Sequence, residues 1–235
     1  MPFIRDETEE SKNRILDVAK RLFSEKGFDA TRVDEIAQDA GVNKALIYYY
    51  FKSKEAILDH LIETLFTAIA AIATEFIKDN IVSMIKKGQL DILQDRWRFA
   101  SEADAEEFYG AVVEYYRGIV DFSLSHRRVV RILIFESLKK GKHHNDLFRM
   151  LDLLNKRDEN SIYQMIWSAD HDFAYSTENI VSKFFFGFVP LFNFAAYFDD
   201  YREASGISEA ELRDTFLCAY QKMASSFIHG KEILL

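Results

Sequence analysis

Helix-breaking residues are scarce in this chain, in which only two prolines and nine glycines interrupt 235 residues. Proline removes a backbone donor and glycine weakens a helix, so their scarcity favours long helices. After about residue 55 the apolar residues recur at helical spacing, and we find no alternating strand pattern, internal repeat or low-complexity tract. The sequence therefore predicts an all-α fold. Beyond the first 60 residues, helices are expected at 103–124, 127–140, 145–168, 177–203 and 208–229.

Two short helices joined at a glycine are expected near the start of the chain. Thr31, with Asp34 three residues later, is expected to cap the first of them, and Gly41 to end it. Asn43 is expected to cap the second, over residues 44–51. This spacing is typical of a helix-turn-helix.

The helices that flank this pair also have predicted limits. An apolar stripe runs along the helix before it, for which Ser11 is the expected N-cap and Gly27 the expected end. Ser53 is expected to cap a fourth, longer helix that begins at Lys54. The first 60 residues therefore contain three helices and the start of a fourth.

The stretch from Gly41 to Lys54, GVNKALIYYYFKSK, contains three consecutive tyrosines and three lysines but no acidic residue. Successive helical residues point about 100° apart, so three neighbours cannot all face one core. If Ile47 and Phe51 face inward, Tyr48 and Tyr49 face outward and Tyr50 lies on a flank. Exposed tyrosines beside lysines suit a phosphate-lined groove, because a phenol donates to phosphate oxygens while its ring packs on sugars or a thymine methyl. An ordinary amphipathic helix with spare aromatics is the alternative.

Composition limits the class of protein. The formal net charge of −8 argues against a protein that coats nucleic acid, although a local basic patch is enough for DNA binding. A single cysteine, Cys218, excludes an internal disulfide framework and suits a reducing cytoplasm. The N-terminus lacks a signal-peptide pattern, and the apolar run 184–198 is too short to span a membrane and contains Pro190. A cytoplasmic protein that is not membrane-embedded is expected.

No enzyme motif is found in the sequence. It has no phosphate loop, dinucleotide fingerprint, nucleophile elbow or metalloprotease motif. The adjacent His143 and His144 could bind a metal, but without a third ligand nearby they are expected to be solvated side chains. We predict no catalytic residue, no metal site and no cofactor.

The aromatic residues before the apolar 180–198 segment have two interpretations. Most are expected to pack in the core, whereas some could line a cavity for a small apolar or aromatic ligand, with a few polar groups to orient it. The candidates for such an effector site are Phe66, Trp97, Phe99, Phe108, Tyr109, Tyr115, Tyr116, Phe122, Phe135 and the polar Arg131, Glu136 and Asn193.

Residues 15–58, ILDVAKRLFSEKGFDATRVDEIAQDAGVNKALIYYYFKSKEAIL, closely resemble the DNA-binding region of tetracycline-repressor-type (TetR family) transcriptional regulators. The resemblance implies a homodimer that places two recognition helices in successive major grooves of a pseudo-palindromic operator. It divides the chain into a DNA-binding domain, 1–54, and an effector-binding and dimerisation domain, 55–235.

The same resemblance implies roles for individual residues. Thr31 and Arg32 are expected to contact phosphates, and Lys54 to clamp one. Leu46 departs from the family, in which many members carry threonine or another small residue, and predicts an apolar contact. The remaining implied DNA contacts are Lys44, Ala45, Tyr48, Tyr49 and Tyr50.

The resemblance also implies that the segments 178–203 and 208–229 dimerise, as half of a four-helix bundle. The predicted function is a cytoplasmic, ligand-responsive regulator, a repressor released from operator DNA by a small hydrophobic effector that moves the fourth helix. The alternative is a helical small-molecule-binding protein or enzyme with a vestigial DNA-binding domain. The expected interface residues are Phe184, Phe188, Phe192, Phe216, Tyr220, Met223 and Phe227.

Overall fold

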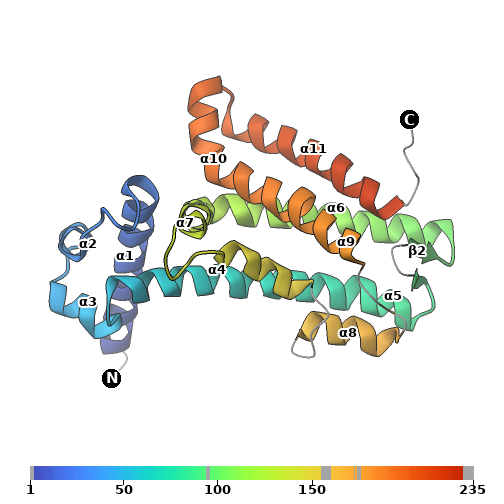
Figure 1. The fold of residues 1–235 in the computed structure, drawn as a ribbon, viewed down its shortest axis with the longest axis horizontal. Helices are drawn as coiled ribbons and strands as arrows, with labels where there is room; N and C mark the ends of the chain where they lie inside the picture. The colour runs from blue at the N-terminus through green and yellow to red at the C-terminus, as the bar shows by residue number, and fades with distance from the viewer. Residues whose placement is uncertain (1–2, 94–95, 155–159, 172, 174–175, 230–235) are drawn as a thin grey trace. The chain divides into compact units, whose positions relative to one another are not determined.

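The computed structural model describes residues 3–93, 96–154, 160–171, 173 and 176–229. Most of the described residues are helical, which confirms the all-α prediction, with one short β-hairpin as an addition (Figure 1). The chain forms two compact units, each made of two segments. Unit 1 contains Met1–Thr67 and His126–Leu147, and unit 2 contains Ala68–Ser125 and Phe148–Leu235.

Unit 1 consists of the first three helices, the first part of the fourth, and a later segment, residues 126–147. Buried Ile15, Phe23, Ile36, Ile47 and Leu58 form its core. On the first helix the buried residues Ile15, Ala19, Leu22 and Phe23 recur at helical spacing and form one apolar stripe. The helices are α1 (Phe3–Lys26), α2 (Val33–Ala40), α3 (Lys44–Tyr50), the first part of α4 (Lys54–Phe76), and α7 (Arg127–Leu138).

Most helix limits in unit 1 follow the predicted capping residues. Gly27 and Gly41 adopt left-handed backbone angles, φ 87° and 64°, immediately after α1 and α2. Oδ1 of Asn43 accepts the backbone N–H of Leu46 at 2.8 Å, as expected for the cap of α3. Ser53 Oγ likewise accepts the N–H of Ala56 at the start of α4.

Two predicted caps are wrong. Helix α1 begins at Phe3, so Ser11 lies inside it. The residues before Ser11 include no glycine, and their acidic side chains favour a helix start. Helix α2 begins at Val33, and its cap is Arg32, whose backbone N–H donates to the Glu35 carboxylate at 3.0 Å. Thr31 does not cap it, because its hydroxyl donates back to the Gly27 carbonyl at 2.9 Å.

Unit 2 contains the end of α4 and the elements that follow it, apart from α7. Helix α6 packs against both α10 and α11, and a two-pronged ion pair from Arg213 to Asp121, at 2.6 and 2.7 Å, joins α11 to α6. The elements are the π-helix η1 (Ile77–Val82), α5 (Ser83–Lys86), β1 (Leu90–Leu93), β2 (Arg96–Phe99), α6 (Glu102–Ser125), the 3₁₀-helix η2 (Asp146–Leu153, shared between the units), α8 (Ser161–Ala169), α9 (Thr177–Ser182), the π-helix η3 (Lys183–Phe188), α10 (Val189–Ser205) and α11 (Glu209–His229).

The hairpin β1–β2 contradicts the expectation that no strands occur. It is antiparallel, and Leu90 pairs with Phe99 while Ile92 pairs with Trp97. Leu90 and Ile92 are buried, whereas Asp91 between them is exposed. Each strand has only four residues, so its alternation is too short to stand out from a helical pattern.

The predicted helix 145–168 is also wrong. A 3₁₀-helix, η2, occupies its first part, and α8 begins only at Ser161. Asn160 is buried, and its Oδ1 accepts the N–H groups of Ile162 and Tyr163 at 3.0 and 3.2 Å. An asparagine that caps a helix in this way starts a new one. The other four predicted helices correspond to α6, α7, the run α9–η3–α10, and α11.

Two helical stretches of the described chain, Lys54–Lys86 and Ile180–Ser205, are long and apolar enough to cross a membrane by length and composition alone. Core helices of other proteins pass the same test. In the second stretch only 28% of the most apolar window is buried, so much of this helix surface is uncovered in a single copy.

Candidate functional site

The outer face of α3 presents two neighbouring exposed aromatic rings. Ile47 and Phe51 are buried beneath the helix, while Tyr48 is 48% and Tyr49 77% exposed. Tyr50 is half-buried and its ring lies edge-on to that of Tyr49, with centroids 5.2 Å apart. The predicted orientations of these five residues are therefore confirmed. Ala45 is exposed beside them and Leu46 is half-buried.

Lys44 lies in the first turn of α3 and pairs with α2. Its Nζ is 2.8 Å from Oδ1 of Asp34, and both side chains are largely exposed. The hydrogen bond to Asp34 raises the pKa of Lys44, so the ammonium stays charged at neutral pH. An exposed pair of this kind contributes little net stability. Lys44 can therefore exchange Asp34 for a phosphate or a base edge at low cost.

The two residues before α2 differ in their exposure. Arg32 is exposed at the helix start, where free N–H groups favour an anion. Thr31 is only 1% exposed and its hydroxyl is bonded to Gly27. The Thr31 side chain therefore presents no surface to a nucleic acid in this structure.

Lys54 occupies an unexpected position. Its ammonium donates to the backbone carbonyls of Phe28 at 2.8 Å and Thr31 at 2.9 Å, and lies 3.5 Å from that of Asp29. The same Nζ is 4.3 Å from the centroid of the Phe28 ring, a cation–π contact. Lys54 thus binds the loop between α1 and α2 rather than presenting a free charge.

A cluster of charges connects the segment after α7 to the rest of unit 1, and sequence reasoning missed it. Lys139 contacts Asp29 at 2.9 Å, and Lys142 contacts both carboxylate oxygens of Asp59 at 2.6 Å. His143 is nearly buried, with Nδ1 2.8 Å from Asp146 and Nε2 3.3 Å from Asp59, the latter an ion-pair distance without hydrogen-bond geometry. Lys139 and Lys142 are too distant in sequence from Asp29 and Asp59 for a local pattern to indicate these pairs.

We expect Asp59→Ala to lower the free energy of unfolding by about 1 kcal/mol, because it removes the carboxylate shared by Lys142 and His143. The urea midpoint, read by circular dichroism, measures the loss. Asp17→Ala is the matched control, since Asp17 forms an exposed pair with Lys20 one helical turn away. An equal change in both variants would contradict a special role for Asp59.

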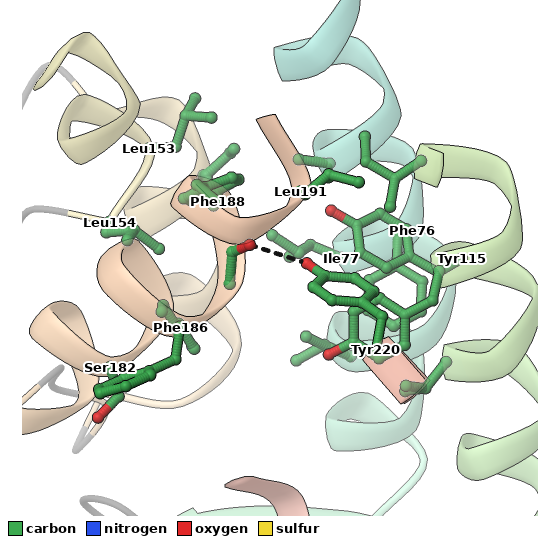
Figure 2. Close-up of a pocket in the computed structure, with 18 of the residues that line it drawn as sticks. Phe76, Ile77, Tyr115, Leu153, Leu154, Ser182, Phe186, Phe188, Leu191 and Tyr220 are labelled. Carbon is green, nitrogen blue, oxygen red and sulfur yellow. Dashed lines mark hydrogen bonds between the residues drawn. The ribbon is translucent and has the colours of Figure 1, made fainter. Parts of the chain in front are cut away.

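Unit 2 contains a cavity of about 370 Å³, within the range of small-molecule sites. Its walls come from α4, η1, β2, α6, η2, α8, α9, η3, α10 and α11, and several aromatic side chains converge on it (Figure 2). The lining residues are Ala73, Phe76, Ile77, Ile81, Trp97, Phe108, Val112, Tyr115, Tyr116, Ile119, Leu153, Leu154, Ile162, Glu178, Ser182, Lys183, Phe186, Gly187, Phe188, Leu191 and Tyr220.

The structure brings together some of the predicted effector residues at this cavity. Trp97, Phe108, Tyr115 and Tyr116 line it, and Phe99 packs on Phe108 with ring centroids 5.4 Å apart. The other predicted residues are not among its lining residues. Phe66 is buried in unit 1, Tyr109 and Phe122 are half-buried on α6, and Asn193 is exposed on α10. On α7, Arg131 lies 5.5 Å from the Phe135 ring, and Glu136 pairs with Lys139.

The predicted interface residues are mostly covered within a single copy. Phe184, Phe192 and Tyr220 are buried, and Phe188 and Tyr220 line the cavity. Phe216 stacks on Phe194 with centroids 3.6 Å apart, which joins α11 to α10. Met223 is half-buried, and the side chain of Phe227 lies outside the described residues.

The exposed apolar residues of the run α9–η3–α10 are not the predicted interface residues. Val181, Phe185 and Phe186 precede α10, and Tyr197 and Tyr201 lie on it, all at least 45% exposed. The π-helix η3 accounts for part of this difference between the predicted and the exposed residues. A π-helix has more residues per turn than an α-helix, so it rotates the faces on either side of it relative to a regular helical projection.

Comparison with known proteins agrees with this geometry. The family model described as "Bacterial regulatory proteins, tetR family" matches residues 15–61. YttP of Bacillus subtilis (strain 168), a probable HTH-type transcriptional regulator, is 37% identical over 83 residues, 32% of this chain and 40% of YttP. IcaR of Staphylococcus aureus (strain Newman), the HTH-type negative transcriptional regulator of the biofilm operon icaADBC, is 44% identical over 55 residues, 23% of this chain and 30% of IcaR.

The matches to these curated relatives thus span less than half of their length. A solved structure of a candidate fatty acid metabolism regulator from Clostridium perfringens extends the likeness in fold to 89% of this chain and 97% of that one, with a TM-score of 0.52 at 15% identity. The exposed face of α3 lies within the residues that the family model matches. Residues 15–61 of this chain are a tetR-family region of bacterial regulatory proteins.

Proposed function

We propose that this chain is a dimeric repressor that binds a pseudo-palindromic operator and is released from it by a small apolar ligand. The observation that carries the proposal is the outer face of α3, where exposed Tyr48 and Tyr49 lie on the same short helix as Lys44 while Ile47 holds the helix to the core. Proteins of the family are transcriptional regulators and not enzymes. The negative regulator IcaR among the relatives supports repression.

In this proposal α3 enters the major groove and the start of α2 faces the phosphate backbone. Lys44 releases Asp34 to bind DNA, and the rings of Tyr48 and Tyr49 pack on sugars or thymine methyl groups. Thr31 and Lys54 act indirectly, by holding the loop between α1 and α2. The proposed direct contacts are Arg32, Lys44, Ala45, Leu46, Tyr48, Tyr49 and Tyr50.

A second copy of the chain is the proposed partner of α10 and α11. The exposed rings of Tyr197 and Tyr201 give α10 an uncovered apolar surface. On α11, the small residues Thr215, Cys218 and Ala219 line a shallow hollow, which allows a neighbouring helix to approach closely. A four-helix bundle of two such pairs covers both surfaces and spaces two copies of α3 for two half-sites.

The cavity of unit 2 is the proposed effector site. Helix α4 contributes residues up to Thr67 to unit 1 and residues from Ala68 to unit 2, where Ala73 and Phe76 line the cavity. A ligand that favours one position of α4 thereby changes the affinity for DNA. A coupling free energy of about 1–3 kcal/mol corresponds to a 5- to 150-fold change in operator affinity. A cytoplasmic location follows from this function, since operator DNA lies there.

We expect Lys44→Ala and Tyr48→Ala each to weaken operator binding roughly 5- to 150-fold, the range for loss of one good base or backbone contact. Gel shifts on the DNA upstream of the chain's own gene, followed by a genome-wide footprint, provide the measurement. Lys140→Ala is the control, because Lys140 is exposed in unit 1 but lies outside the residues matched to the DNA-binding region. Size-exclusion chromatography should show unchanged dimers.

Two outcomes would contradict this placement. If both variants bind the operator normally, α3 is not the recognition helix. If the wild-type chain binds no DNA yet binds ligands in its cavity, the alternative of a ligand-binding protein with a vestigial DNA-binding domain holds.

A further inference from the structure

Three tyrosines of the cavity differ in what their hydroxyl groups bind. The Tyr220 hydroxyl donates to the Gly187 carbonyl of η3 at 3.2 Å, which Figure 2 shows as a dashed line. Among the described residues, the hydroxyls of Tyr115 and Tyr116 have no hydrogen-bond partner. Both residues line the cavity from α6, and the phenol of Tyr115 extends toward the helix that carries Leu191 (Figure 2).

These two hydroxyls remain protonated. Burial raises the pKa of Tyr115 to about 12, and burial together with Tyr115 raises that of Tyr116 further. They are therefore neutral donors at any physiological pH. Both side chains are half-buried at the cavity, so a ligand that fills it without an acceptor takes their hydroxyls out of water unpartnered, which is unfavourable. A ligand atom that accepts from these hydroxyls therefore gains affinity.

The rest of the lining selects against charge. Apart from Glu178 and Lys183, every lining residue is uncharged, and these two have opposite sign. The deeper walls are aromatic and aliphatic, including Phe76, Trp97 and Phe108. An ionised ligand loses its hydration there without a net opposite charge to replace it. The arrangement therefore favours an uncharged molecule over a carboxylate or an amine.

The backbone around the cavity also has the character of a binding site. Within the described residues, both π-helical segments contribute to its walls, η1 through Ile77 and Ile81 and η3 through Phe186 and Phe188. π-helices occur frequently at functional sites, where they interrupt the regular helical register. An interruption at both sides of one cavity is unlike the packing of an ordinary core.

We propose that the cavity takes an uncharged, largely aromatic ligand bearing one hydrogen-bond acceptor such as a carbonyl, and that the hydroxyls of Tyr115 and Tyr116 recognise this acceptor. The inference deepens the proposed effector role of the cavity and rests on it. Tyr115 and Tyr116 select the ligand, while Tyr220 maintains the wall through Gly187.

The test uses three probes of similar shape: 2-acetylnaphthalene, which is neutral with a carbonyl acceptor, 2-isopropenylnaphthalene, which lacks the acceptor, and 2-naphthoate, which is anionic. Equilibrium dialysis of the full chain gives their Kd values. The ketone is expected to bind about tenfold tighter than either of the other probes, as one or two neutral hydrogen bonds allow.

The variants separate recognition from packing. Tyr115→Phe combined with Tyr116→Phe keeps both rings and should abolish the tenfold preference for the ketone, while the hydrocarbon Kd stays within about twofold. Tyr220→Phe is the matched control, because its hydroxyl is already bonded to the protein, and it should keep the preference. If the double variant also loses the hydrocarbon, the two single variants are measured in its place.

The proposal is overturned if the wild type binds ketone and hydrocarbon equally, binds 2-naphthoate tightest, binds none of the probes, or keeps its preference without the two hydroxyls. Gel shifts on the same preparation without probe distinguish this failure from failure of the proposed function. If the chain binds DNA but shows no preference for the ketone, only the proposed ligand class is refuted. If it binds no DNA, the proposed repressor function is refuted, whatever the dialysis shows.

Discussion

Lys54→Met is expected to weaken operator binding about tenfold while leaving its salt dependence unchanged. The Lys54 ammonium donates to the carbonyls of Phe28 and Thr31, which fix the loop before α2. Methionine keeps the aliphatic stem but removes these bonds, at a cost of about 1–2 kcal/mol for a half-buried charged donor. The start of α2 then loses its fixed position, and with it the alignment of Arg32.

Salt titration distinguishes this structural role from a phosphate contact. Each phosphate contact that is lost reduces the slope of log K against log salt by about 0.9. Lys44→Met, the matched control, should reduce the slope by that amount per subunit, because Lys44 is free to exchange Asp34 for a phosphate. Operator Kd values between 50 and 200 mM salt measure both slopes. An equal reduction in Lys54→Met would show that Lys54 leaves the loop to clamp a phosphate.

Tyr197→Glu combined with Tyr201→Glu is expected to convert the proposed dimer to monomers and to weaken operator binding on the order of 100-fold. Both rings are exposed on α10, where Asp199 and Asp200 are already exposed. Four added carboxylates in an interface between two copies repel one another without counter-ions, and like charges across an interface cost several kcal/mol. Sedimentation velocity measures the oligomeric state, and gel shift measures the affinity.

Trp167→Glu provides the control for this experiment. Trp167 is also a large exposed apolar residue of unit 2, but it lies on α8. The dimer should survive its substitution. If Trp167→Glu dissociates the dimer and the α10 variant does not, the interface lies at α8. Phe192→Glu is unsuitable as a probe, because Phe192 is buried within one copy and a charge there unfolds the chain.

Local chemistry made α3 predictable. A glycine that accepts a left-handed angle, an asparagine that caps the next helix, and two apolar residues one turn apart orient the tyrosines between them. Each of these interactions joins residues a few positions apart. The same holds for the ends of α1 and α2 at Gly27 and Gly41, and for the cap of α4 at Ser53.

Residues whose partners are distant in sequence were not predictable in this way. The sequence predicts a free charge at Lys54, yet its partners are the carbonyls of a loop more than twenty positions earlier. Asp59 and Lys142 are 83 positions apart. Asn160 ends a helical pattern that periodicity alone continues, because its side chain bonds to the backbone of α8.

The aromatic residues show most clearly where sequence information ends. The sequence by itself determined most of the helical architecture and the exposed face of α3, because both depend on contacts within one or two turns. Only the tertiary structure divided the remaining aromatic side chains among the core, the cavity and the outer surface of α10. A phenylalanine suits all three environments equally, and the π-helix η3 rotates the face that each one presents.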